Sequence, residues 1–227
     1  MKKMVIYSEV AYLIGVLLLA VGNSLCAFGD LGMSMVVAPA YVLHLALVRV
    51  WPWFSFGVAE YTVQAVVILT LIVMTRRVKA RFFLSYGTTL LYGVFLDVFV
   101  GVVALLPSVL GLRIAAYVVG FAFGSAGVAV LFTTYFPPGL YEVLVQEIVG
   151  KWKLRLGVVK TVYDIGSLLV AVAMSLLIFG SLRGIGVGTV ACAFLNGTLI
   201  HLFGKAYTRL FTVKDALPWR AFFDGKK

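Results

Sequence analysis

Charged side chains within long apolar stretches are the residues of this sequence best suited to chemistry. Four ionisable groups occupy such positions, namely Glu60, Asp97, Lys160 and Asp164. A charge at the centre of a membrane helix costs about 2.5–3.5 kcal/mol on insertion scales, so each needs a partner or a purpose. The purposes that fit carboxylates and an ammonium are binding a substrate or carrying a proton.

Lys160 and Asp164 stand four residues apart, which places them on one face of a helix. They are either a self-neutralising pair that helps the helix insert or a substrate or proton site. Lys160 is also near enough to the start of its helix for its ammonium to reach the membrane surface. Glu60 has a similarly shallow position on the outer side, so solvation at the interface is its alternative.

Asp97 has no basic neighbour in the sequence. It lies fifteen residues after Phe82, where its apolar stretch begins. That separation is about 22 Å of helix, which places Asp97 in the outer part of the membrane. Asp164 lies seven residues after Gly157 and falls in the inner part. The two carboxylates are therefore candidate stops on opposite halves of one pathway.

Two breaks interrupt the apolar pattern and add polar candidates. The first, Gly29–Ser34, contains Asp30 and Ser34, and it is either a surface turn or a broken helix that offers backbone groups to an ion. The second, Pro137-Pro138-Gly139, is followed by Glu142, which is either a ligand or an acid that caps the next helix. No cofactor or metal is expected.

The composition identifies the solvent of most of this chain as lipid. Hydrophobic residues make up 63% of the 227 residues and charged residues only 12%, against about 45–50% and 25% in soluble domains. The mean hydropathy is +1.08. Intrinsic disorder is excluded, and no nucleophile–base arrangement or phosphate-binding loop indicates an enzyme. The sequence predicts a single all-α polytopic membrane domain over residues 1–227.

Six stretches are long enough to cross a membrane, which takes about 20 apolar residues. Two shorter apolar stretches, 33–48 and 139–149, have the character of broken or re-entrant helices. The predicted spans are 10–28, 57–75, 82–106, 113–135, 157–179 and 184–204.

Basic residues favour six spans with both termini in the cytoplasm, because Lys and Arg accumulate in cytoplasmic loops. With this topology, 15 basic residues lie inside, 3 lie outside (Arg49, Arg113 and Arg183) and Lys160 lies within a span. If both short segments crossed, the count would be 13 against 5. The net charge of +10 is thereby explained by topology, and no nucleic-acid partner is expected. Residues 205–227 are expected to form a basic, amphipathic cytoplasmic tail.

The two halves of the chain repeat with an offset of about 100 residues. The segment 56–60 matches 156–160, so that Glu60 aligns with Lys160 and Gln64 with Asp164. Three-span repeats over about 8–106 and 113–204 must be inverted relative to each other, an architecture of secondary transporters with the site between the repeats. We therefore expect Glu60, Gln64, Lys160 and Asp164 to line one cavity together with Asp97.

The same alignment pairs Gly87 with Gly188. A residue without a side chain lets helix backbones approach closely in lipid. Both glycines are therefore predicted to lie at close helix crossings, and the same packing role is expected for Gly120 and Gly124.

Four parts of the sequence resemble a known family, namely residues 20–24 with 30–34, 92–97, 157–164 and 184–189. Together they are similar to the YczE/YyaS/YitT-like bacterial membrane proteins. The resemblance extends over nearly the whole chain and implies a bacterial inner-membrane protein with duplicated halves, but it implies no particular activity.

The leading hypothesis is a small secondary transporter or permease for a small solute, coupled to an ion or a proton. A non-transporting membrane scaffold or accessory subunit is the alternative, and a channel is the third. The expected partners are membrane lipids, an unidentified small molecule or ion, and a second copy of the chain in a homodimer. The location expected is the bacterial cytoplasmic membrane.

Overall fold

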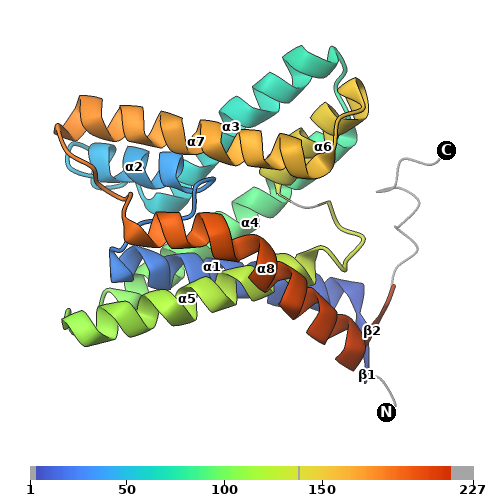
Figure 1. Ribbon diagram of the computed structural model, residues 1–227, viewed down its shortest axis with the longest axis horizontal. Helices are drawn as coiled ribbons and strands as arrows, with labels where there is room; N and C mark the ends of the chain where they lie inside the picture. The colour runs from blue at the N-terminus through green and yellow to red at the C-terminus, as the bar shows by residue number, and fades with distance from the viewer. Residues whose placement is uncertain (1–3, 138, 216–227) are drawn as a thin grey trace.

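The computed structural model describes residues 4–137 and 139–215. In this part of the chain it has eight helices and one two-stranded sheet (Figure 1). The helices are α1 (Ser8–Gly29), α2 (Ala38–Leu47), α3 (Phe56–Thr75), α4 (Ala80–Val103), α5 (Leu110–Leu131), α6 (Leu140–Trp152), α7 (Leu156–Phe179) and α8 (Val187–Leu210), and the strands are β1 (Met4–Tyr7) and β2 (Phe211–Lys214).

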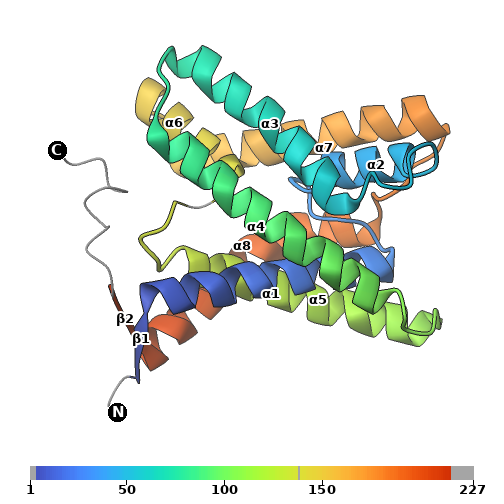
Figure 2. The same ribbon diagram turned by 180° about the vertical axis from the view of Figure 1, so that it is seen from behind.

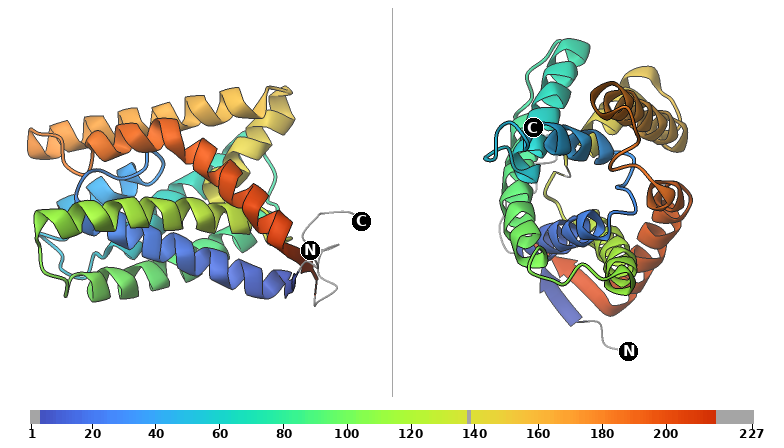
Figure 3. Two further views of the ribbon diagram at one scale, coloured as in Figure 1. Left: turned by 60° about the horizontal axis from the view of Figure 1, so that its bottom comes forward. Right: turned by 90° about the vertical axis from the view of Figure 1, so that its left-hand side faces the viewer.

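Six of the helices are long and apolar enough to cross a membrane, which confirms the predicted spans. The other two, α2 and α6, have 10 and 13 residues. At 1.5 Å per residue they extend for about 15 and 20 Å, less than the roughly 30 Å of a hydrocarbon core. They lie at opposite ends of the bundle, where the predicted re-entrant segments were expected (Figures 1 and 3).

The two ends of the described chain meet in a parallel strand pair. Met4 pairs with Phe211 and Tyr7 with Lys214, so the segments before α1 and after α8 lie on the same side of the bundle (Figure 1). Residues 205–214 therefore differ from the amphipathic cytoplasmic tail that the sequence predicts. The helix α8 continues through Lys205 to Leu210 because a basic last turn complements the helix dipole, and β2 follows. Residues 216–227 of that tail are outside the described residues.

The first break is tied to the loop before α8. Asp30 ends α1 in the left-handed conformation, with φ of 52°, and Gly32 follows with φ of 109°. The amide of Met33 then donates to the carbonyl of Gly184 (2.9 Å), and the amide of Gly188 donates to the carbonyl of Leu31 (2.8 Å). These two backbone bonds hold the start of α8 against the segment that leads into α2.

The central contact of the bundle is between α1 and α5, which run antiparallel, while α4 crosses α1 on the other side (Figure 2). Gly15 faces Gly127, and two turns further along Gly22 faces Gly120. A Cβ added at Gly22 would lie 2.6 Å from the carbonyl oxygen of Gly120, and one at Gly127 would lie 2.7 Å from the carbonyl oxygen of Gly15. Backbone therefore packs directly on backbone along this contact.

The prediction that Gly87 and Gly188 lie at close crossings is half right. A Cβ at Gly188 would meet the phenol of Tyr117 and lie 2.8 Å from the carbonyl oxygen of Leu31. A Cβ at Gly87 would meet nothing within 4 Å. Gly87 lies on an exposed face of α4. Its alignment with Gly188 therefore did not predict a close helix contact.

The loop after α2 and the loop after α6 are expected on opposite sides of the membrane. Single cysteines replacing Arg49 and Lys153, in a chain whose native cysteines are changed to alanine, test this. An impermeant maleimide applied to sealed vesicles should label one of them from outside and the other only after permeabilisation. Labelling of both from the same side would contradict the six-span topology.

Candidate functional site

A cavity of about 380 Å³ lies inside the bundle. Six spanning helices contribute to its lining, namely α1, α3, α4, α5, α7 and α8. The segment Ser34–Val37 before α2 and the first turn of α6 also reach it, so both short helices begin at the cavity. The end-on view shows the helices arranged around this region (Figure 3).

One wall of the cavity is a hydrogen-bonded network centred on Glu60. This residue is 0% exposed. Its Oε2 accepts from Gln64 Nε2 (3.1 Å) and from the hydroxyl of Tyr141 (3.0 Å). The hydroxyl of Thr89 donates to Gln64 Oε1 (2.5 Å). Three helices, α3, α4 and α6, are therefore joined by one polar network.

The helix α7, which packs on α6, contributes an ion pair to the lining. Lys160 Nζ lies 3.5 Å from Asp164 Oδ1, as their four-residue spacing predicts. Lys160 also attracts the carboxylate of Glu142, which lies in the first turn of α6. The carboxyls of Glu60 and Glu142 are near enough to repel each other. The cavity thus holds three acidic groups and one basic group among its lining residues.

The structure brings six of the eight predicted site residues together. The alternative that Glu60 is solvated at the membrane interface is wrong, because its side chain is buried and α6 covers it. Ser34 lies at the start of α2, where its carbonyl accepts from the amides of Val37 and Ala38. The six that line the cavity are Ser34, Glu60, Gln64, Glu142, Lys160 and Asp164.

Asp97 does not line the cavity. Its Oδ1 accepts from the amide of Gly57 (2.7 Å), and its Oδ2 accepts from the hydroxyl of Ser55 (2.6 Å). The Ser55 oxygen in turn accepts from the amide of Val58 (3.1 Å). Asp97 therefore caps the start of α3 from α4, where a carboxylate is favoured by the helix dipole. Its proposed place in the cavity was wrong because the amides at the start of α3 supply the partner that its own helix lacks.

Asp30 is also outside the cavity. Its Oδ2 lies 2.8 Å from Arg113 Nη2, and the Asp30 side chain is 60% exposed. An exposed pair of this kind stabilises a protein by about 1 kcal/mol or less. Asp30 therefore joins the end of α1 to the start of α5 at the surface.

Sequence reasoning missed several polar residues of the cavity. Asn23 on α1 donates to the hydroxyl of Tyr92 on α4 (2.8 Å), and Ser125 on α5 donates to Asn196 on α8 (3.0 Å). Tyr141 was missed too, although it follows the second break directly. Uncharged polar residues are common on membrane helices, and only the packing shows which of them meet.

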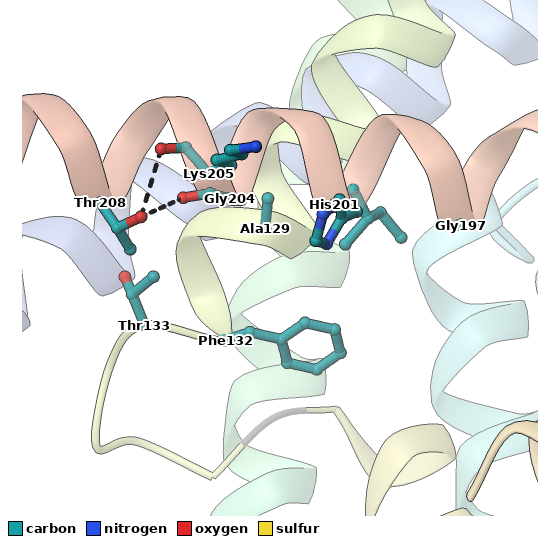
Figure 4. Close-up of a pocket in the computed structure, with 9 residues that line it drawn as sticks. Ala129, Phe132, Thr133, Gly197, His201, Gly204, Lys205 and Thr208 are labelled. Carbon is teal, nitrogen blue, oxygen red and sulfur yellow. Dashed lines mark hydrogen bonds between the residues drawn. The ribbon is translucent and has the colours of Figure 1, made fainter.

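A second hollow of about 540 Å³ lies between the ends of α5 and α8 (Figure 4). Its polar side chains include His201, Lys205, Thr133 and Thr208. The Thr208 hydroxyl donates to the carbonyls of Gly204 and Lys205, within its own helix (Figure 4). None of the predicted site residues lies there, so we place the candidate site in the inner cavity.

Within residues 4–137 and 139–215, no three His, Cys, Asp or Glu side chains come together to hold a metal ion. Six apolar spanning helices around a polar cavity define a polytopic helical membrane protein. The chain belongs to the family of unknown function DUF6198, whose family model matches residues 6–205. No curated protein and no solved structure matches the chain.

Proposed function

We propose that this chain is a small secondary transporter whose solute occupies the inner cavity. The observation that carries the proposal is that both short helices begin at this cavity, between two sets of spanning helices. Transporters place their sites near the membrane midplane, where discontinuous helices meet.

The order and packing of the helices support an inverted repeat of α1–α4 and α5–α8. Each half runs long, short, long, long. Packing partners also correspond, because α1 packs on α4 as α5 packs on α8, and α2 packs on α7 as α6 packs on α3. Between described residues, α3 packs closely on α4 and α7 packs less on α8.

The membrane and orientation belong to the same proposal. The ends with β1 and β2 lie on one side of the bundle, together with the basic loops after α3 and α6. This distribution favours a cytoplasmic position for both ends. A bacterial cytoplasmic membrane and a kinship with the YczE/YyaS/YitT-like proteins are proposed from the resembling stretches alone.

Accessibility of the cavity from both membrane faces tests transport without knowledge of the solute. A single cysteine replacing Ser34, in a chain with Cys26 and Cys192 changed to alanine, should react with an impermeant methanethiosulfonate reagent in right-side-out and in inverted vesicles. A cysteine replacing Lys153 is the control and should react from one face only. A Ser34 position that reacts from neither face would contradict transport and favour the scaffold, while steady single-channel currents would indicate a channel.

A further inference from the structure

One carboxylate oxygen in the cavity wall is unpaired. Both hydrogen bonds to Glu60 end on Oε2. Oε1 is buried and has no hydrogen-bond partner among the described residues. A buried charged group without a full set of partners is costly. Glu60 is among the residues that line the cavity, so a cationic group bound there would supply the missing partner.

The charges around Glu60 favour a positive partner. The charged residues that line the cavity are Glu60, Glu142, Asp164 and Lys160. Lys160 is engaged with Asp164 and attracts Glu142, so it does not neutralise Glu60. With all four groups ionised, the lining carries three negative charges and one positive charge, and an entering cation would offset part of the net negative charge.

The starts of α2 and α6 are the features that would favour an anion, because helix N-termini carry partial positive charge. At each of these starts, two backbone amides already donate to a nearby carbonyl. The amides of Val37 and Ala38 donate to the carbonyl of Ser34, and the amides of Glu142 and Val143 donate to the carbonyl of Gly139. The Glu142 carboxylate also lies in the first turn of α6. We therefore give the buried Oε1 of Glu60, which has no partner among the described residues, more weight than these two helix ends.

The size and lining of the cavity favour an organic ion over a bare metal ion. A volume of about 380 Å³ is at the lower end of the range for small-molecule pockets. Most of the lining that α1 and α5 contribute is apolar, including Val16, Leu19, Phe121 and Val128. Such a surface fits the uncharged part of a small solute.

We propose that the cavity binds a small organic cation, with its charged group at Glu60 Oε1 and its apolar part against α1 and α5. The inference names the substrate class of the transport site and rests on the proposed function for that reason. A guanidinium or a substituted ammonium has the required charge and N–H donors.

Three probes of similar size separate charge from shape. Benzylguanidinium is a cation, benzylurea is its neutral isostere, and phenylacetate is an anion. Binding of each probe to the purified full chain in detergent is measured by calorimetry. The protein should bind benzylguanidinium, and it should bind the other two probes at least tenfold more weakly. Tighter binding of phenylacetate, or equal binding of benzylurea, would overturn the proposal.

Substitutions of opposite sign place the binding at the cavity. Glu60→Gln keeps the side-chain volume and should weaken benzylguanidinium binding by roughly ten- to a hundredfold, as expected for loss of one charged hydrogen bond. Asp30→Asn removes a carboxylate outside the cavity and should leave the affinity unchanged. Lys160→Gln removes the one basic group of the lining and should tighten binding. An unchanged affinity in both cavity variants would overturn the assignment, even if one of them folded poorly.

Flux distinguishes this inference from the proposed function. Radiolabelled benzylguanidinium should exchange across proteoliposomes that contain the parent chain, faster than across those with Glu60→Gln. Binding that depends on Glu60 without any flux would retain the cation site and contradict transport. Labelling of Ser34 from both faces with no preference for the cation would retain transport and contradict the cation site.

Discussion

Replacing Gly22 with leucine is expected to lower the yield and the thermal stability of the folded protein. The site is the contact where α1 packs on α5, and an added Cβ would meet the backbone of Gly124 and lie 2.6 Å from the carbonyl oxygen of Gly120. Backbone cannot move aside as a flexible side chain can. We expect a loss of about 3 kcal/mol or more, at the upper end of overpacking costs, from a total stability that is typically about 5–15 kcal/mol. Gly22→Ala should cause a smaller loss.

Gly87→Leu is the matched control for this prediction. Gly87 is also a glycine within a spanning helix, but a Cβ there would meet nothing within 4 Å. Leucine is a better helix former than glycine, so this variant should fold at least as well as the parent. Monodisperse yield and thermal unfolding in detergent measure both variants. Equal melting temperatures for Gly22→Leu and Gly87→Leu would show that the α1–α5 contact is looser than described.

Replacing Asp97 with alanine is expected to be the most destabilising change at a carboxylate. It removes the acceptors of the Gly57 amide and the Ser55 hydroxyl, at 2.7 and 2.6 Å. Hydrogen bonds to charged groups contribute about 1.5–3 kcal/mol each. Because Asp97 is only partly buried, we expect a combined loss of about 3 kcal/mol. Asp97→Asn keeps one carbonyl acceptor and should lose about half as much.

Thermal unfolding compares these variants with Asp30→Asn, whose exposed pair with Arg113 should contribute about 1 kcal/mol or less. Solute binding separates a capping role from a role in the pathway. If Asp97→Asn melted like the parent but lost binding of benzylguanidinium, Asp97 would belong to the transport pathway after all.

The spans could be predicted because the hydrophobic effect acts on local sequence. A stretch of about 20 apolar residues has one stable arrangement in lipid, so the ends of all six spans and both short helices were predicted to within six residues. The Lys160–Asp164 pair was equally local, since four-residue spacing fixes it. The strand pair was missed because β1 and β2 gain their hydrogen bonds only from each other, across nearly the whole chain.

Contacts between helices decided the remaining site residues. Glu60 looked shallow along α3, yet α6 covers it and donates the hydroxyl of Tyr141. Asp97 looked unpartnered along α4, yet the start of α3 supplies its partners. The position of a residue along its own helix gives its distance from the end of that helix. It does not show which neighbouring helix covers the side chain. The alignment of Glu60 with Lys160 placed both at one cavity because it related two helices to each other.

The pairing of β1 with β2 imposes an order on biosynthesis. The segment Met4–Tyr7 is synthesised before all eight described helices, and its partner Phe211–Lys214 is synthesised after them. During synthesis β1 therefore remains an unpaired edge at the membrane surface, a form of backbone that other chains or proteases can engage. Closing the strand pair removes that edge only after all six helices have been inserted. The strand pair thus forms only after every described helix has been synthesised, and it links the two ends of the described chain.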